Sequence, residues 1–512
     1  MRDNVFLHCL KLMVFLLYRL LRVGEDYSME MIDSVFWILL IVINLIFAIT
    51  ITFLERRNVS ASWAWLMVLS FIPIGGFILY IVLGQNLSKR RIFTWDRRGY
   101  EAIERGIKQQ QKHLREGVAP FNTYLTQEYK DLLMMNMTTD HSLYTWNNEL
   151  EIFTDGRDKF DSLFKDIAAA KKNIHVLYYI IQNDVYGNRL LEALTEKAKE
   201  GVEVRLLYDD AGSRRISKKR VKKLIEAGGS AYAFFPGKLP IINLRINFRN
   251  HRKIVIIDKE IGYMGGFNVG EEYLGLNPRF GYWRDTHLRI RGNAVNDLQV
   301  RFLLDWAQAS GEKVTWNDDY FLYTDERNEA GVGLQIVTSG PDSTWEQIKT
   351  SYIRMILDAK EYVYIQTPYF IQDDSVLDAI RIASVSGVDV RVMIPNKPDH
   401  LFVYWATYSY VGEVLKAGAK VYLYGNGFLH AKTMVIDDSI ATVGTANIDV
   451  RSFRLNFEVN AIIYHEDSSV NLRNTFEKDL MECIELTPEV YNNRPLYIRF
   501  KESISRLLSP VL

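Results

Sequence analysis

A pattern of histidine, lysine, aspartate and asparagine occurs twice in the chain. The first copy, HRKIVIIDKEIGYMGGFN, runs from His251 to Asn268, and the second, HAKTMVIDDSIATVGTAN, runs from His430 to Asn447. In both copies His-x-Lys is followed by an aspartate and then by Gly-(Gly/Thr)-x-Asn at the same spacing. A pattern repeated in register with the residues around it indicates a duplicated site rather than packing alone.

The lysines and asparagines of the two copies predict an anion site. Strand alternation places each histidine and its lysine on one face. If the copies pack about a pseudo-twofold axis, Lys253, Lys432, Asn268 and Asn447 converge around one pocket, for which a phosphate is the natural guest. One histidine can then attack phosphorus while the other protonates the departing alcohol and deprotonates the incoming one. The lysines and asparagines would stabilise the charge on the phosphate oxygens.

Each such histidine needs a partner for its second ring nitrogen. One carboxylate candidate follows each copy, in GYWRDTHLRI and in DVRSFRLNFEVN. We expect Asp285 to orient His251 and Glu458 to orient His430.

The aspartates inside the two copies have a different predicted role. Asp258 and Asp437 end their strands, and we expect them to support the site from the turn, by binding turn amides. The sequence has no carboxylate cluster spaced for magnesium, no His/Cys set spaced for zinc and no glycine-rich nucleotide loop. The predicted chemistry therefore uses neither a metal nor a cofactor.

Two long uncharged runs precede this region. Between Asp33 and Glu55 lie 21 uncharged residues, and between Arg57 and Lys89 lie 31. About 20 apolar residues cross a bilayer as a helix, so residues 31–88 predict a hairpin of two transmembrane helices rather than a pair of buried soluble helices.

Basic residues set the predicted orientation of that hairpin. Five follow the second run between residues 89 and 98, whereas the turn has two. The positive-inside rule then puts the large domain on the cytoplasmic side of the membrane. In residues 1–30, Lys11, Arg19 and Arg22 share one helical face, which predicts an amphipathic membrane-surface helix rather than a cleaved signal peptide.

The rest of the chain has the organisation of a repeat. Strand candidates such as GVEVRLLYDD and GVDVRVMIPN alternate with helical segments in the same order twice. We expect an α/β fold with two repeats, at 141–325 and 326–490, each a mainly parallel sheet flanked by helices. Residues 89–140 are interpreted as a basic juxtamembrane linker, and residues 491–512 as a C-terminal helix that either docks on a surface or braces the domain.

Acids and bases balance at 62 each, so net charge selects no partner. One segment, RRISKKRVKK, is locally basic and predicts either a grip on anionic lipid headgroups or a solvated helix face. Its basic residues are Arg214, Arg215, Lys218, Lys219, Arg220, Lys222 and Lys223.

The doubled HxKxxxxD motif resembles the signature of the phospholipase D superfamily. With the two N-terminal runs, QTPYF (366–370) and RSFRLNFE (451–458), the chain is similar to bacterial cardiolipin synthases. It departs from many superfamily members at Gly266, where they have serine. The resemblance implies a multi-pass enzyme of the bacterial cell membrane that acts on phosphatidylglycerol among anionic phospholipids, without a cofactor or nucleic acid.

The resemblance also implies a reaction. Two phosphatidylglycerols give cardiolipin and glycerol through a phosphatidyl-histidine, with His251 as nucleophile and His430 as general acid and then base. A phospholipase D-type hydrolase and a phosphatidyltransferase for another alcohol use the same residues and stay open as alternatives. A nuclease would not need two membrane spans, and a scaffold would not need both histidines and both lysines. The Asp-rich motif of CDP-alcohol-type synthases is absent from the sequence.

Overall fold

The computed structural model describes most of the chain, with gaps. The described residues are 29–49, 59–72, 75, 76, 79, 80, 92, 93, 97–121, 123–236, 247–313, 317–322, 331–343, 345–507 and 509. The surface helix predicted for residues 1–30 lies outside them, except for its last two residues. The chain divides into a small unit of residues 1–86 with 237–247, and a large unit of the remainder.

The small unit contains two helices within the predicted membrane hairpin. They are α2 (Met29–Ile49) and α3 (Val59–Phe71). Among the described residues, none of the helices is both long enough and apolar enough to cross a bilayer. The membrane-spanning character of residues 31–88 stays a prediction.

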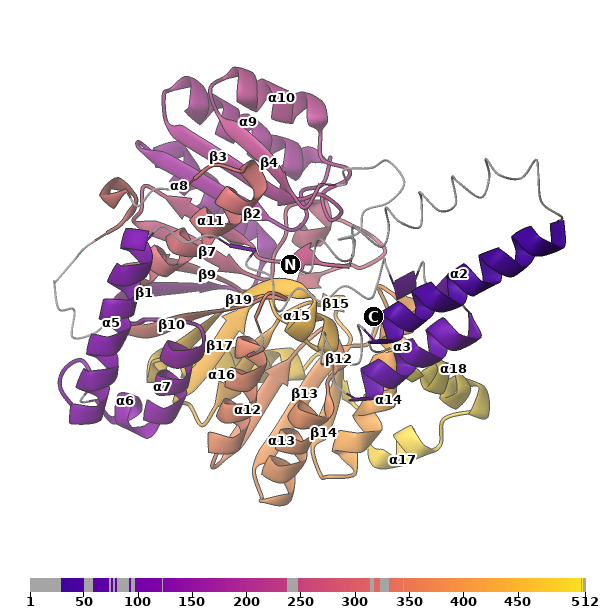
Figure 1. Ribbon diagram of the computed structural model, residues 1–512. Coiled ribbons are helices and arrows are strands. Elements are labelled where there is room, and N and C mark those ends of the chain that lie inside the picture. Colours follow the sequence, from indigo (N-terminus) through magenta and orange to yellow (C-terminus); the bar gives the residue numbers. More distant parts are fainter. Residues whose placement is uncertain are drawn as a thin grey trace. The chain divides into compact units, whose positions relative to one another are not determined.

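The large unit is built on one continuous sheet to which both repeats contribute (Figure 1). Outward from the central antiparallel pair β1–β10, the first repeat follows the order β9, β7, β6, β2, β3, β4, and the second follows β19, β17, β16, β11, β13, β14, with β20 at its edge. The two orders are equivalent, as a pseudo-twofold axis through the central pair requires. The strands of the first repeat are β1 (Tyr144–Phe153), β2 (Asn173–Tyr178), β3 (Glu203–Asp209), β4 (Ser230–Phe234), β6 (Ile254–Ile257), β7 (Ile261–Gly265) and β9 (His287–Arg291). Those of the second are β10 (Val332–Ser339), β11 (Tyr362–Gln366), β13 (Asp389–Pro395), β14 (Lys420–Tyr424), β16 (Thr433–Ile436), β17 (Ile440–Gly444), β19 (Asn456–Tyr464) and β20 (Cys483–Glu485).

The expectation of mainly parallel sheets is wrong, because the sheet is mixed. Strands β2–β3–β4 and β11–β13–β14 are parallel, and their connections run through helices. The strands that follow the two histidines instead form tight antiparallel hairpins, β6–β7 and β16–β17. Positive φ angles at Asp258, Lys259, Asp437 and Asp438, between 50° and 58°, make the turns that hairpins favour.

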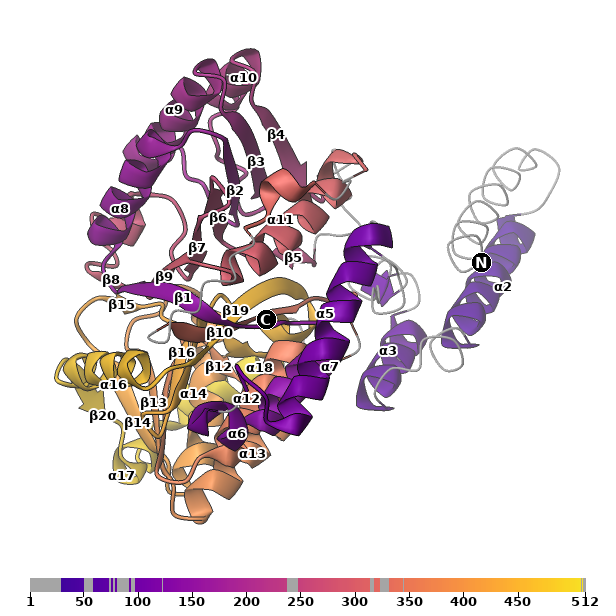
Figure 2. The ribbon, with the colours of Figure 1, turned by 90° about the vertical axis from the view of Figure 1, so that its left-hand side faces the viewer.

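Helices cover the sheet in the same order in both repeats (Figure 2). Aspartates at the N-caps of α8, α9 and α13 accept hydrogen bonds from the first turn, which stabilises these starts. The helices of the first repeat are α8 (Gly156–Ala169), α9 (Val185–Lys199), α10 (Lys218–Glu226) and α11 (Ala294–Ser310). Those of the second are α12 (Gln347–Asp358), α13 (Asp374–Val385), α14 (Leu401–Leu415), α15 (Val450–Arg454) and α16 (Glu466–Leu480).

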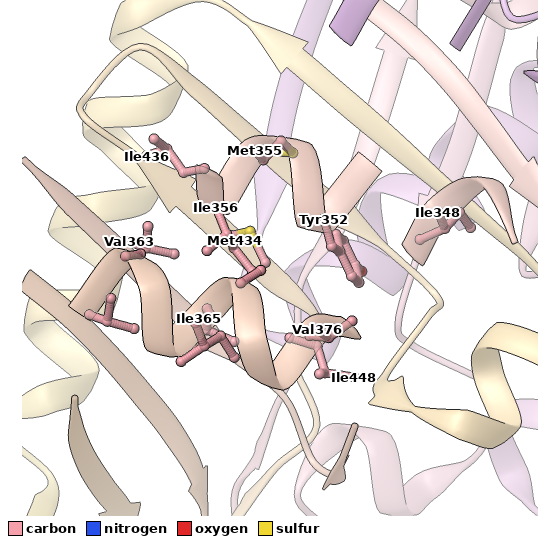
Figure 3. Packing of buried hydrophobic residues seen from close by; sticks show 14 of the residues in the cluster. Ile348, Tyr352, Met355, Ile356, Val363, Ile365, Val376, Met434, Ile436 and Ile448 are labelled. Atoms are coloured by element: carbon pink, nitrogen blue, oxygen red, sulfur yellow. The ribbon is translucent and has the colours of Figure 1, made fainter. Parts of the chain in front are cut away.

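Buried apolar side chains fill the space between the helices and the sheet. Figure 3 shows part of this core, where Tyr352 and Ile356 of α12 face Ile365 of β11 and Met434 of β16. A second cluster takes residues from both repeats, so the two halves share one core. That shared core holds the elements at the site in place.

The segment expected to be a linker is a folded part of this unit. Residues 97–139 form α5 (Arg97–Glu116), α6 (Tyr124–Glu128) and α7 (Lys130–Thr139). Leu114 and Leu133 belong to the core, and the amide of Gln110 hydrogen-bonds both backbone groups of Tyr144. The sequence of α5 is rich in basic residues, and its few buried apolar residues did not indicate a helix that packs on the core. The C-terminal segment contains α17 (Pro488–Asn492) and α18 (Leu496–Leu507).

Candidate active site

The two histidines lie where short strands cross from one repeat to the other. β5 (Arg249–Asn250) pairs in parallel with the start of β19, and β15 (Phe428–Leu429) pairs in parallel with β8 (Trp283–Arg284). The amide of His251 donates to the carbonyl of Phe457 at 2.9 Å, and that of His430 donates to the carbonyl of Arg284 at 2.7 Å. Each histidine is therefore fixed by the backbone of the opposite repeat.

The carboxylate partners are crossed relative to the sequence expectation. Nδ1 of His251 lies 2.9 Å from Oε2 of Glu458, and Nδ1 of His430 lies 2.5 Å from Oδ2 of Asp285. The pairing expected within each repeat is wrong because β5 and β15 carry each histidine across to the strands of the other repeat. A carboxylate accepts only, so Nδ1 carries the proton and Nε2 is left for a substrate.

Both carboxylates are fully buried and further fixed. Glu458 accepts from Thr445 Oγ1 at 2.6 Å and from Asn456 Nδ2 at 3.1 Å. Asp285 accepts from the amide of Thr286 at 2.8 Å. A Cβ on Gly266 would lie 1.9 Å from Oδ1 of Asp285, so glycine, and not serine, fits at this point of the first copy.

Burial shapes the charges of the two ion pairs. Burial lowers the pKa of His251, and it lowers the pKa of His430 to about 4, with Lys432 acting in the same direction. Burial opposes ionisation of Asp285 and Glu458, but the adjacent histidines and lysines overcome it and hold both carboxyl pKa values below their usual range. Both histidines are therefore neutral at neutral pH, the form in which Nε2 can act as nucleophile or base.

The two lysines lie beside the histidines and are also buried. Nζ of Lys253 donates to the carbonyl of His251 at 2.7 Å, and Nζ of Lys432 donates to the carbonyl of His430. Burial lowers the pKa of Lys253 to about 7 and that of Lys432 to about 8. The charge of Lys432 also lowers the pKa of Lys253, and the charges of both lysines lower the pKa of both histidines. Two clustered buried cations form a site that an anion would stabilise.

The asparagines at the ends of the two copies are buried next to this centre. Oδ1 of Asn268 accepts from the amide of Ile180 at 3.2 Å, and Nδ2 of Asn447 donates to Asp449 at 3.1 Å. Their side chains are 2% and 4% exposed, so their orientation is fixed by protein contacts.

Two aromatic residues at the site were missed in the sequence. The ring of Tyr179 lies 4.8 Å from that of His251, and the indole of Trp283 lies 5.1 Å from the ring of His430. Trp283 stands two residues before Asp285, and Tyr179 directly follows β2. Their positions next to a predicted site residue and at a strand end could have indicated a role at the site, although aromatic residues are common elsewhere in the chain.

Comparisons with known proteins show the family to which the chain belongs. Residues 163–280 and 352–480 match the family model described as cardiolipin synthase, PLD-like domain, and residues 42–85 match phospholipase D-nuclease N-terminal. The major cardiolipin synthase of Bacillus subtilis (strain 168) is 57% identical over 482 residues, which cover 94% of this chain and all of the relative. The chain belongs to the bacterial cardiolipin synthase family of the phospholipase D type.

Further relatives agree in sequence or in fold. A cardiolipin synthase of Oceanobacillus iheyensis is 54% identical and covers 92% of this chain and 98% of its own length. The crystal structure of a phosphatidylserine synthase from Haemophilus influenzae Rd KW20 has a TM-score of 0.57 at 14% identity, and covers 76% of this chain and all of its own. That structural likeness supports the fold.

In this cardiolipin synthase-family chain, the motif aspartates bind backbone. The carboxylate of Asp258 accepts from the amides of Lys171, Lys172 and Asn173 at 2.7–3.0 Å. Asp437 accepts in the same way from three amides at residues 360–362. Both aspartates therefore fasten the catalytic hairpins to the start of a neighbouring strand.

Replacing Asp258 should lower stability. Asp258→Ala removes the acceptor of three backbone amides, so we expect the free energy of unfolding to fall by about 1–3 kcal/mol. Urea unfolding of the large unit, followed by circular dichroism, measures this change. Glu260→Ala, an exposed carboxylate two residues away, is the matched control, and an equal loss in both variants would contradict the role given to Asp258.

The basic segment begins next to the site. Ser213 Oγ donates to the carbonyl of Tyr179 at 2.9 Å, and the segment follows directly. Val221 and Leu224 bury one face of α10, and Arg220 pairs with Glu192. The remaining basic residues are exposed, namely Arg214, Arg215, Lys218, Lys219, Lys222 and Lys223.

Within the described ranges, no cluster of three or more histidine, cysteine or carboxylate side chains is placed to hold a metal ion.

Proposed function

We propose that the enzyme transfers a phosphatidyl group from one phosphatidylglycerol to a second, with cardiolipin and glycerol as products. Membership of the cardiolipin synthase family supports the reaction class. The observation that carries the proposal is the pair of crossed histidine–carboxylate contacts. They give two neutral imidazoles, each with Nδ1 held and Nε2 available, beside two buried ammonium groups.

The first step breaks the bond between phosphorus and the glycerol headgroup of the donor. Nε2 of His251 attacks phosphorus and forms a phosphatidyl-histidine. His430, protonated on Nε2 when the anionic substrate is bound, gives that proton to the departing glycerol oxygen. Glu458 stabilises the positive charge that develops on the imidazole of His251.

The second step consumes the intermediate. Now neutral, His430 takes the proton from the free headgroup hydroxyl of a second phosphatidylglycerol. The resulting oxygen attacks phosphorus, the bond to His251 breaks, and cardiolipin is released. Lys253 and Lys432 stabilise the non-bridging oxygens in both steps. The proton returns to His430, so one cycle leaves the enzyme unchanged.

A reaction with phosphatidylglycerol alone tests this proposal. The purified full chain, in detergent and without added metal or nucleotide, should form cardiolipin and glycerol in equal amounts. Phosphatidic acid in place of cardiolipin would mean that water is the acceptor. Products from another alcohol alone, with none from phosphatidylglycerol, would identify a different phosphatidyltransferase.

The buried lysines predict an alkaline limit to activity. The pKa of Lys253 is lowered to about 7 and that of Lys432 to about 8, so the cationic forms are lost as pH rises through these values. Because kcat/KM reports the free enzyme, it should fall between about pH 7 and 9. In Lys253→Arg the guanidinium keeps its charge, and we expect the decline to begin at higher pH. A pH-independent kcat/KM up to pH 9 would contradict this assignment.

We also propose that the basic segment draws the enzyme to anionic headgroups. Lys218→Glu with Lys222→Glu should raise KM for phosphatidylglycerol vesicles by about thirtyfold or more at low ionic strength, since each lost cation contributes about 1 kcal/mol near an anionic surface. The effect should shrink at high salt, while kcat stays unchanged. The control is the same pair of lysine-to-glutamate substitutions at Lys108 and Lys112 of α5. An equal rise in KM there would mean that the net charge of the protein, and not the basic segment, determines the effect.

Residues 31–88 are proposed to anchor the enzyme in the bacterial cell membrane, with the large unit in the cytoplasm. The basic residues after residue 88 support this orientation. In a Cys9→Ser background, a cysteine at exposed Glu196 should react with a membrane-impermeant maleimide only after spheroplasts are broken. Labelling in intact spheroplasts would mean that the large unit lies on the outer side of the membrane, which contradicts the proposed orientation.

A further inference from the structure

The C-terminal helix α18 presents its apolar side to solvent and its polar side to the protein. Leu496, Leu507 and Phe500 are 80%, 77% and 66% exposed, whereas Glu502 and Ser505 are 4% and 2% exposed. At about 100° per residue, the exposed apolar residues fall on one stripe along the helix. An ordinary surface helix has the opposite arrangement. The stripe consists of Leu496, Tyr497, Phe500, Ile504 and Leu507.

Polar contacts fix this orientation. Both carboxylate oxygens of Glu502 accept from Arg494, at 2.8 and 2.9 Å. The guanidinium of Arg506 lies 4.6 Å from the ring of Tyr410 and 3.6 Å from the carboxylate of Glu413, both in α14. Turning the stripe toward the protein would break these contacts, so the contacts stabilise the orientation in which the stripe is exposed.

The charges around the stripe are positive. Arg499, Lys501 and Arg506 are exposed, and Glu502, the one acidic residue in the sequence of α18, is buried in its pair with Arg494. Nζ of Lys501 lies 5.4 Å from the rings of both Tyr497 and Trp405. An apolar stripe with a cationic border is typical of a helix that lies in the interface of an anionic membrane.

The helix α14 packs beside α18 (Figure 1). Residues 501 and 506 contact residues 405 and 410 in turn, so the two helices run in the same direction. Their N-terminal ends therefore lie together, and there Leu401 and Phe402 are 65% and 56% exposed.

The residue Asp399 lies two positions before α14. It accepts from the hydroxyl of Tyr369, and its charge raises the pKa of Lys432. The exposed apolar residues of α14 therefore follow, in sequence, a carboxylate whose charge acts on one of the residues proposed to bind phosphate.

We propose that the stripe of α18, together with the first turn of α14, docks in the headgroup layer of an anionic bilayer. The substrate could then pass from the bilayer to the histidines without full exposure of its acyl chains to water. This placement rests on the proposed function only in that the substrate is a lipid. A second copy of the chain fits the surface less well, because its cationic border would face the same cations.

The first test measures contact with lipid in the full chain. In a Cys9→Ser background, Phe500→Cys carries an environment-sensitive dye; Cys483 reacts little because burial raises its thiol pKa to about 12. In phosphatidylglycerol–phosphatidylcholine vesicles, lipids with a nitroxide near the headgroup should quench the dye at least twofold. A dye at Glu196→Cys, in α9, should not be quenched. Quenching by aqueous iodide instead of lipid, or by neither, would overturn the proposal, since the latter means that protein covers the stripe.

The second test separates docking from catalysis. Phe500→Glu with Ile504→Glu should lower kcat/KM for phosphatidylglycerol in vesicles about tenfold, and leave turnover of monomeric short-chain phosphatidylglycerol unchanged. Val185→Glu puts a carboxylate at an exposed apolar position of α9 and should affect neither. An equal loss with the monomeric substrate would show distortion of the site and contradict docking. If the wild-type enzyme turns over neither substrate, the proposed function fails, and dye quenching still decides the docking.

Discussion

His430→Ala should release one equivalent of nitrophenol from phosphatidyl-p-nitrophenol and then stop, whereas His251→Ala should release none. Nitrophenolate leaves without a general acid, so the first step needs only the nucleophile. The second step still needs a base to activate the incoming hydroxyl. His430→Ala should therefore hold a phosphatidyl group on His251, and cardiolipin formation should fall by about 10⁴-fold or more in both variants.

Intact-protein mass spectrometry detects the trapped intermediate, and rapid mixing measures the burst. His113→Ala, which removes a histidine of α5, should turn over normally. A burst in His251→Ala and none in His430→Ala would exchange the two roles. A normal cardiolipin rate in either variant would exclude the two-histidine mechanism.

The crossed carboxylates should separate the two steps again. Glu458→Gln removes the charge beside His251, 2.9 Å from its Nδ1, and should slow the nitrophenol burst by about 10²–10⁴-fold. Asp285→Asn removes the charge beside His430, and should leave the burst almost unchanged while cardiolipin formation slows by a similar factor. Both substitutions keep the shape of the side chain and one of its two acceptor oxygens, while the other oxygen becomes an NH2 donor.

Transient kinetics with the activated donor, compared with steady-state cardiolipin synthesis, measures both effects. Thermal melting of the two variants is the control, because unpaired buried groups also cost stability. If Asp285→Asn suppresses the burst and Glu458→Gln does not, His430 is the nucleophile. If both suppress it equally, the carboxylates act through the shape of the shared site.

The repeated motif predicts the candidate site, but not how the repeats cross. Histidine, lysine and asparagine spacing predicted a common pocket, and the offsets between strand candidates predicted two equivalent halves. The pairing of Glu458 with His251 depends on β5 and β19, and β5 is two residues long. A strand that short leaves no pattern in a sequence, so the nearer carboxylate was assigned instead.

The sequence pattern also could not predict the direction of the strands after the histidines or which side of α18 faces the protein. The hairpins depend on positive φ angles at Asp258 and Asp437, which aspartate tolerates without requiring. Periodicity shows that α18 is amphipathic. Which side faces the protein is decided by tertiary partners such as Arg494 and Arg506, whose contacts a sequence does not display.

The crossed pairs have a consequence for synthesis of the protein on the ribosome. Glu458 follows His251 by 207 residues, and His430 follows Asp285 by 145 residues. Neither pair of histidine and carboxylate can therefore form until most of the chain has left the ribosome. A nascent first repeat has a histidine with no carboxylate to orient it. We therefore expect a chain truncated before Glu458 to be inactive.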